Sequence, residues 1–351
     1  MDGTVVIYIQ AYNAECTLRR ALESVLQQTY SNWVVYLVDN GSTDGTKEIA
    51  EDYARQDARI VLKHVASNDI WYFYSFVEAY LKKPLGDYFA WLDADDAYKP
   101  EFLENSMSFI RKNRLSVCVC GTDYIDASSG KTQLTKKPDA DFVMSGRGFS
   151  ERFLEYRRFT DTLWGKVYSF SLLKSVEYKQ IPRIRFAPDS VIVLELFKKC
   201  YQSGMRIGFL AEPLHQYYRA PTTLSRCFSL EFADDFFIYH KVLTDYLKCF
   251  GKIGKLNGDY LSAIWLGWIQ DFFTHIRNAD IALPQKVTAL NKLFSSPITT
   301  AMLRRKADPC FRNLAARREF CQSVGSWMRP YENDDKCGLA VRNILAILKV
   351  E

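Results

Sequence analysis

The sequence predicts an α/β fold, with a mainly parallel sheet flanked by helices, followed by an α-helical C-terminal domain. Short β-branched runs alternate with segments of helical periodicity from residue 5 to about residue 120, which is typical of βαβ units. After about Ser229 only helical periodicity remains. The length of 351 residues exceeds what one hydrophobic core usually supports, so we expect two units that divide near residues 228 and 229.

The first hundred residues contain four expected strands, each followed by polar residues. The strands are expected at residues 5–9, 32–38, 59–64 and 88–92. Helices are expected near residues 18–26 and at 46–56 and 70–82. Tyr12-Asn13, Asp39 and Asp93-Asp95 come at strand ends, and the carboxyl ends of parallel strands line the ligand crevice of such sheets.

The rest of the chain begins as a further helix and strand and then becomes helical. We expect a helix at residues 100–113, a strand at 115–120, and a mobile loop over the polar stretch 126–141. Helical periodicity then marks residues 232–250, 259–276, 284–294 and 341–348.

Composition excludes several classes of protein. A net charge of +5 is too small for a nucleic-acid-binding surface. The N-terminal residues show no secretory signal, so we expect a cytoplasmic protein whose nine cysteines stay reduced. Cys118 and Cys120 lack a second ligand pair, which argues against zinc. The aromatic content of 15% suits an enzyme that stacks sugar rings, although it equally fits core packing.

The sequence Asp93-Ala94-Asp95-Asp96 is the strongest chemical signal. Alternate residues of a strand share a face, so we expect Asp93 and Asp95 to point together and Asp96 to point away. Two close carboxylates repel each other unless a cation lies between them, and Mg²⁺ or Mn²⁺ with phosphate oxygens suits such a pair. A solvated acidic turn is the alternative, because a single D-x-D motif is short and common.

Together with this motif, YIQAYNAECTLRRALESVLQQTYSNWVVYLVDNGSTDGT and GDYFAWLDADD resemble glycosyltransferase family 2. Members of this family are inverting enzymes of the GT-A, Rossmann-like fold. The resemblance is strong over residues 5–96 and weaker to about residue 225. It implies a catalytic domain at 1–228, with a nucleotide-sugar-binding half at 1–99 and an acceptor half at 100–228, before the helical domain at 229–351.

The resemblance also implies which residues bind the donor and the metal. Asp39 is expected at the nucleotide base, and its carboxylate can accept a hydrogen bond from N3–H of uracil. Asp95 is expected to bind Mn²⁺ or Mg²⁺, together with Asp93, which also contacts the ribose. The expected donor-binding residues are Ala11, Tyr12, Asn13, Glu15, Asp39, Asp93, Ala94 and Arg219. Asp44 is expected only to cap the helix that follows it.

On the acceptor side, the resemblance points to Trp164, Pro188 and Asp189. Inverting transfer needs one carboxylate to take the acceptor hydroxyl's proton, and Asp189 matches the family's base, with Glu195 as the fallback. Asp189 could instead simply cap the next helix. Pro188 replaces the family's glutamate, and Trp164 suits either sugar stacking or core packing.

Arg219 matches an arginine that neutralises the diphosphate in the family. Ala220 and Pro221 follow it, where many relatives have a metal-binding histidine. His215 lies nearby, but we expect it to be structural. The aromatic segment at residues 71–74 also departs from the family, and either lines a sugar subsite or packs the helix on the sheet.

The sequence therefore predicts a metal-dependent inverting glycosyltransferase. It would move a sugar from a nucleoside-diphosphate sugar, expected to be UDP-linked, to a hydroxyl of a glycan, a lipid-linked saccharide or a protein, for example in bacterial cell-surface polysaccharide biosynthesis. The alternative is a catalytically silent GT-A relative that binds sugar or acts as a scaffold. A dinucleotide-binding enzyme is disfavoured because no G-x-G-x-x-G follows the first strand.

The C-terminal helices suggest two further contacts. Basic clusters at 304–306 and 317–318, with an amphipathic stretch at 341–348, would allow peripheral contact with the inner face of the membrane. A helix packed on its own domain is the alternative. The same helices offer surface for a homodimer.

Overall fold

The computed structural model describes residues 3–219, 229–305 and 317–348. Its internal contacts divide the chain into two compact units. The α/β unit contains residues 1–183 and 192–223, and the helical unit contains residues 184–191 and 224–351.

The α/β unit is built on one ten-stranded sheet with the order β3-β2-β1-β4-β9-β6-β10-β5, to which β7 and β8 are added at β6 and β10. The strands are β1 Val5–Ala11, β2 Trp33–Asp39, β3 Ile60–His64, β4 Tyr88–Trp91, β5 Ala97–Tyr98, β6 Val117–Asp126, β7 Thr132–Lys136, β8 Phe142–Met144, β9 Lys166–Ser169 and β10 Ile207–Arg219. The α/β class predicted from the sequence is confirmed.

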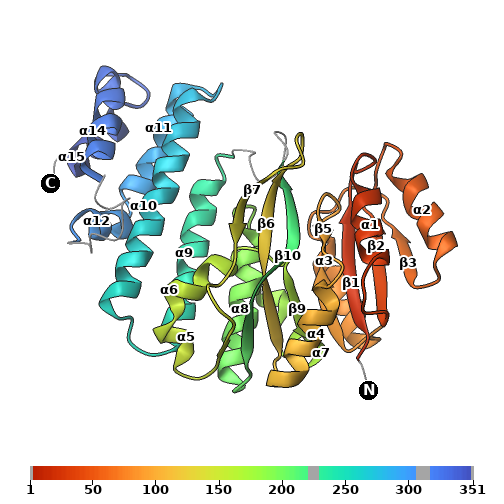
Figure 1. Cartoon of the computed structure of the whole chain (residues 1–351). Helices are drawn as coiled ribbons and strands as arrows, with labels where there is room; N and C mark the ends of the chain where they lie inside the picture. Colours follow the sequence, from red (N-terminus) through yellow and green to blue (C-terminus); the bar gives the residue numbers. More distant parts are fainter. Residues whose placement is uncertain (1–2, 220–228, 306–316, 349–351) are drawn as a thin grey trace. The chain divides into compact units, whose positions relative to one another are not determined.

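The parallel part of the sheet is the part that the sequence predicted most clearly. Strands β3, β2, β1 and β4 run parallel to one another. Strand β9 is antiparallel to both of its neighbours, β4 and β6, while β6 and β10 lie parallel and side by side (Figure 1). The carboxyl ends of β1, β2 and β4 therefore meet at one edge of the sheet.

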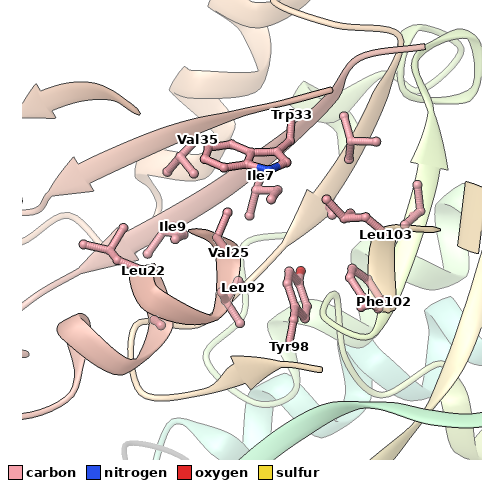
Figure 2. Packing of buried hydrophobic residues seen from close by; sticks show 14 of the residues in the cluster. Ile7, Ile9, Leu22, Val25, Trp33, Val35, Leu92, Tyr98, Phe102 and Leu103 are labelled. Atoms are coloured by element: carbon pink, nitrogen blue, oxygen red, sulfur yellow. The ribbon is translucent and has the colours of Figure 1, made fainter. Parts of the chain in front are cut away.

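One face of the sheet carries a core made with α1 (Leu18–Leu26), α2 (Thr46–Gln56) and α4 (Phe102–Asn113). Alternate residues of β1 belong to it, as expected for a strand with period two. Figure 2 shows Ile7 and Ile9 of β1 close to Leu22 and Val25 of α1. The apolar stripe of α1 therefore fixes that helix over β1.

The other face of the sheet is covered by α3 (Tyr72–Lys82) and is unusually aromatic. The ring centroid of Tyr8 lies 4.5 Å from that of Phe76 and 4.7 Å from that of Trp91. Phe73 and Tyr74 are buried as well. These contacts favour the packing alternative for the aromatic segment.

The remaining helices of the α/β unit are short, apart from α8. They are α5 Gly148–Glu151, α6 Phe153–Tyr156, η1 Arg157–Phe159, α7 Phe170–Lys174, η2 Tyr178–Gln180 and α8 Pro188–Gln202. Helix α8 begins in the segment that clusters with the helical unit.

The expectation of a mobile loop over residues 126–141 is wrong. Strand β6 runs to Asp126, and β7 pairs antiparallel with it, so the stretch contains a hairpin. The carboxylate of Asp126 accepts hydrogen bonds from the backbone N–H groups of Ser128 and Ser129, which closes the turn. Residues of β7 are mostly exposed, so the strand carries no alternation of apolar and polar residues for a sequence pattern to reveal.

The helical unit confirms the predicted helical C-terminal part. Its described helices are α9 Phe232–Cys249, α10 Lys255–Asn278, α11 Leu283–Phe294, α12 Pro297–Leu303, α14 Arg317–Met328, η4 Arg329–Tyr331 and α15 Gly338–Leu348 (Figure 1). The indole of Trp265 is fully buried, and its N–H donates to Thr299 Oγ1. Among the described helices, none combines the length and the apolar character needed to cross a bilayer.

Candidate functional site

The acidic motif forms a turn directly after β4. The strand ends at Trp91, and the backbone N–H of Asp96 donates to the carbonyl of Asp93 at 3.1 Å. One carboxylate oxygen from each of Asp93, Asp95 and Asp96 lies within 4.8 Å of the others. The expectation that Asp96 points away is therefore wrong, because strand alternation no longer applies once the chain turns.

Burial sets the electrostatics of this turn. The side chain of Asp96 is fully buried, and burial, followed by the charges of Asp93 and Asp95, raises its pKa well above the usual value. Burial also raises the pKa of Asp95, partly offset by Arg20. Three carboxyl groups with hard oxygen ligands fit a divalent cation, which would remove their mutual repulsion.

Two other side chains hold the turn in place. The guanidinium of Arg20 donates to the carbonyl of Asp95 and lies 3.7 Å from the ring centroid of Tyr218. The carboxylate of Asp96 accepts a hydrogen bond from the backbone N–H of Tyr218 at 3.0 Å. The acidic turn is thus tied to both α1 and β10. The sequence reasoning missed Arg20, since nothing in the sequence distinguishes it from Arg19.

The loops after β1 and β2 are linked by their own side chains. Asn13, at φ 49°, accepts from the N–H of Thr43 at 2.9 Å, and Glu15 accepts from the N–H of Gly45 at 2.8 Å. Asp44 lies one residue before the N-cap of α2, and its carboxylate accepts from the N–H groups of Thr46 and Glu15, so it does more than cap the helix. Asn13 and Glu15 therefore shape the loops, and their contact with a donor remains a prediction.

The other expected donor residues after β1 and β4 differ in exposure. Ala11 is fully buried, and its carbonyl accepts from the N–H of Asn40 at 2.8 Å. Ala94 is 8% exposed, whereas Tyr12 is 44% exposed. A large apolar ring open to solvent beside a polar loop is a feature that a planar base could cover.

Asp39 ends β2 as a buried carboxylate. It accepts from the N–H of Ser42 at 3.1 Å, and its other oxygen lies 3.0 Å from Nδ1 of His64. His64 is the last residue of β3 and is partly exposed. The sequence reasoning missed His64, although its register opposite Asp39 follows from the pairing of β2 with β3.

Trp164 lies in the core rather than on an open surface. Its indole is 8% exposed and stacks on the ring of His215 with centroids 4.3 Å apart. Burial, with Lys166 nearby, lowers the pKa of His215 to about 3, so the imidazole is neutral. Its Nε2 lies 3.4 Å from the carboxylate of Asp96. These contacts support the structural role expected for His215 and the packing alternative for Trp164.

Arg219 is the last residue of β10 and lies opposite Asp126, the last residue of β6. Its guanidinium carbon lies 4.7 Å from the ring centroid of Tyr124. Ala220 and Pro221, which replace the expected histidine, lie outside the described residues. Lys306 of the basic cluster lies outside them as well.

Asp189 and Pro188 belong to the segment that clusters with the helical unit. Helix α8 begins at Pro188, so Asp189 lies in its first turn and is not the residue that precedes the helix. Whether Asp189 acts as the base or only stabilises the start of this helix therefore stays open at this point. Glu195, the fallback base, is paired with Lys198 Nζ at 2.9 Å.

The structure thus brings the expected residues together in three groups. The acidic turn gathers Asp93, Asp95 and Asp96. The loops after β1 and β2 form a second group, and Asp189 lies in the helical unit. Carboxylates at the carboxyl end of a parallel strand, beside the loops that follow its neighbours, are the arrangement expected at the ligand crevice of a Rossmann-like α/β protein.

Comparison with known proteins gives the family. Residues 6–177 match the family model of Glycosyl transferase family 2. Through these residues the chain belongs to glycosyl transferase family 2, a family of transferase enzymes.

Its relatives carry the same class name. The uncharacterized glycosyltransferase EpsJ of Bacillus subtilis is 29% identical over 64% of this chain and 64% of its own length. The chain therefore aligns with somewhat less than two thirds of that relative. The uncharacterized glycosyltransferase YibD of Escherichia coli is 26% identical over 74% of this chain and 73% of its own length.

Solved structures share the fold. The crystal structure of Staphylococcus aureus TarS 1–349 in complex with UDP has a TM-score of 0.57 and 17% identity, over 99% of this chain and 90% of that one. The same protein in complex with UDP-GlcNAc gives a TM-score of 0.53 and 16% identity over the same shares. At this identity the likeness shows the GT-A fold alone.

Proposed function

We propose that this protein transfers a sugar from a UDP-sugar to an acceptor hydroxyl by a single inverting displacement. The observation that carries the proposal is the group of three carboxylates in the turn at the carboxyl end of β4. Family membership supports the reaction class, and the position of the turn supports a donor diphosphate there.

The donor would lie along the ends of β1, β2 and β4. Asp39 would accept from N3–H of uracil, and Ala11, Tyr12, Asn13, Glu15 and Ala94 would border the nucleotide. The TarS structures with UDP and UDP-GlcNAc support the choice of a uridine nucleotide. The contacts of Asp39 with Ser42 and His64 would hold its carboxylate ready for the base.

Asp95 and Asp93 would hold a Mn²⁺ or Mg²⁺ ion. When bound, the ion would supply positive charge to the diphosphate as the bond to the sugar breaks. Arg20 would keep the turn in place from α1 through its hydrogen bond to the carbonyl of Asp95. Arg219 would add a second positive charge at the leaving group.

Asp189 would act as the base that takes the proton of the acceptor hydroxyl. Its position in the first turn of α8 places the carboxylate near the positive end of the helix dipole, which favours the ionised form. Pro188, and Trp164 through its packing, would shape the acceptor side. The acceptor is a hydroxyl of a glycan, a lipid-linked saccharide or a protein.

The cellular setting is a further part of the proposal. The enzyme would act in the cytoplasm, on bacterial cell-surface polysaccharide, with its C-terminal basic residues against the inner face of the membrane. The helical unit would also offer surface for a homodimer. A silent scaffold remains the second candidate, because Pro188 stands where the family has an acceptor-binding glutamate.

Thermal unfolding with a panel of nucleoside diphosphates and UDP-sugars, with and without Mn²⁺, tests the proposal. A bound donor raises the unfolding temperature by mass action, so one nucleotide should give a shift that depends on the metal. The D95A variant should lose both this shift and metal-dependent release of UDP. D245A, on the exposed face of α9, serves as the control. No shift with any nucleotide would favour the scaffold.

A further inference from the structure

The segment that carries Asp189 is anchored to the helical unit by a carboxylate. Asp235, in the first turn of α9, accepts hydrogen bonds from the backbone N–H groups of Arg185 and Phe186, at 2.8 and 2.9 Å. Both bonds reach the same oxygen, Oδ2. Asp235 is only 9% exposed, so these bonds are shielded from competing water.

The side chain of Phe186 provides a second anchor in the same unit. Its ring centroid lies 4.7 Å from that of Phe236 and 5.4 Å from that of Trp268. Phe232 and Tyr239 surround the same ring at 5.7 and 6.0 Å. The chain is therefore held by its backbone and by a side chain three residues before Asp189.

The residue between this anchor and α8 has a strained backbone. Ala187 has a backbone φ of 51°, which lies in the left-handed region that residues other than glycine rarely adopt. Pro188 follows it, with a ring that restricts φ at the start of the helix. Such strain persists only where the surrounding contacts over-determine the conformation, and it is common at functional sites.

We infer that Asp235 is a positioning residue for Asp189. Its carboxylate fixes the backbone at residues 185 and 186, the strained Ala187 transmits that constraint, and Asp189 is presented by the first turn of α8. The inference rests on the proposed function of Asp189 as the base.

The neighbouring residue gives a matched control. Asp234 precedes Asp235 in the same first turn, but its side chain is 61% exposed and pairs with Lys292. D234N and D235N each remove one charge from the same turn of α9. Only D235N weakens the bonds to the loop that carries Asp189.

The test measures UDP release from the UDP-sugar that the wild-type protein hydrolyses, with kcat and donor affinity determined separately. We expect kcat to fall about tenfold in D235N and about a hundredfold in D235A, because small displacements of a catalytic group have effects of this size. Donor affinity should stay within about twofold of the wild type, since Asp235 lies in the other unit from the donor residues. D234N should match the wild type in both.

A double variant separates positioning from general stability. In a D189A background, adding D235N should leave the slow residual release unchanged, because both changes act through the same proton transfer. If D235A does not fold, D235N still decides the matter, since its amide oxygen keeps an acceptor at the site.

Two results overturn the inference while leaving the proposed function intact. One is wild-type kcat in D235N and D235A. The other is an equal loss of kcat and of donor affinity in these variants, which would indicate general unfolding. If the wild-type protein binds no nucleotide and releases no UDP, the proposed function fails, and the inference fails with it.

Discussion

Two buried side chains, Asp96 in the acidic turn and His215 of β10, form a close pair. Asp96 and His215 have no exposed side-chain surface, and their polar atoms lie 3.4 Å apart. Neither Asp96 Oδ2 nor the two ring nitrogens of His215 has a hydrogen-bond partner among the described residues. Buried polar atoms in this state are costly, so the pair carries consequences for stability that can be measured.

The neutral state of His215 predicts a pH dependence. Its folded pKa of about 3 lies below the ordinary value of 6.5, so between these values the unfolded chain binds more protons. Its contribution to stability is therefore full above pH 6.5 and is lost as the pH falls toward 3. Within this range the free energy of unfolding falls by at most about 1.4 kcal/mol for each pH unit.

Denaturant unfolding of the wild type and of H215F, at pH 7 and pH 5, measures this difference. H215F keeps an aromatic ring against Trp164 and lacks the titrating group. The raised pKa of Asp96 works in the opposite direction, since a carboxyl group with a raised folded pKa stabilises the protein at low pH. An identical loss of stability in both proteins between pH 7 and pH 5 would contradict the assignment.

The backbone conformation at Gly41, in the loop after β2, requires a glycine. It has a φ of +77°, and a Cβ atom there would lie 2.7 Å from the backbone of Ser67. We expect G41A to lower the free energy of unfolding by about 2–3 kcal/mol, from strain and the steric clash together. Urea denaturation measures the loss.

Gly130 provides the comparison for Gly41. Its φ is +68°, but nothing lies within 4 Å of the added Cβ. G130A should therefore cost only about 1 kcal/mol, for the backbone conformation alone. Equal costs for the two substitutions would show that the close approach of Ser67 has no effect.

At the scale of elements, α3 is attached to the sheet by aromatic rings. Phe76 is 3% exposed, and its ring centroid lies 4.6 Å from that of Tyr36, in addition to its contact with Tyr8. Replacing it with alanine removes a large ring from a packed layer. We expect F76A to destabilise the protein by about 3–5 kcal/mol, from lost burial and the remaining cavity.

Ser75 is the control for this helix. It is exposed and precedes Phe76, so S75A should change stability by less than about 0.5 kcal/mol. Circular dichroism during urea denaturation compares the two variants. A small effect of F76A would mean that α3 contributes little to the stability of the α/β unit.

At the scale of the whole molecule, donor binding should slow amide hydrogen exchange in the α/β unit and leave the helical unit unchanged. The expected donor residues lie in the α/β unit, whereas α10 belongs to the helical unit. With UDP and Mn²⁺, amide hydrogen exchange should slow at residues 11–15, 39–45 and 93–96 because ligand binding opposes local opening. Exchange in α10 should not change.

Slower exchange confined to α10 would place the ligand elsewhere. The D95A protein gives the control, since it should show no slowing at residues 93–96 with the same nucleotide and metal. This measurement needs no acceptor, so it tests the donor site even while the acceptor is unidentified.

Much of the element order could be predicted from the sequence. Hydrophobic periodicity depends on neighbours along the chain, so strands β1 to β4 and helices α9 to α11 were visible within a few residues of their bounds. Asp93 and Asp95 were visible for the same reason, because a short motif follows an apolar strand. The hairpin of β6 and β7 was not, since its exposed residues have no apolar alternation.

The supports of the site depend instead on residues that are distant in the sequence. Arg20 reaches the carbonyl of Asp95, 75 positions away, and Asp235 reaches Arg185, 50 positions away. Nothing in the local sequence of either residue signals its partner. Local patterns therefore indicate elements and motifs, whereas the burial of Asp96, the neutral His215 and the anchoring by Asp235 arise only when folding brings separate segments together and removes water from between them.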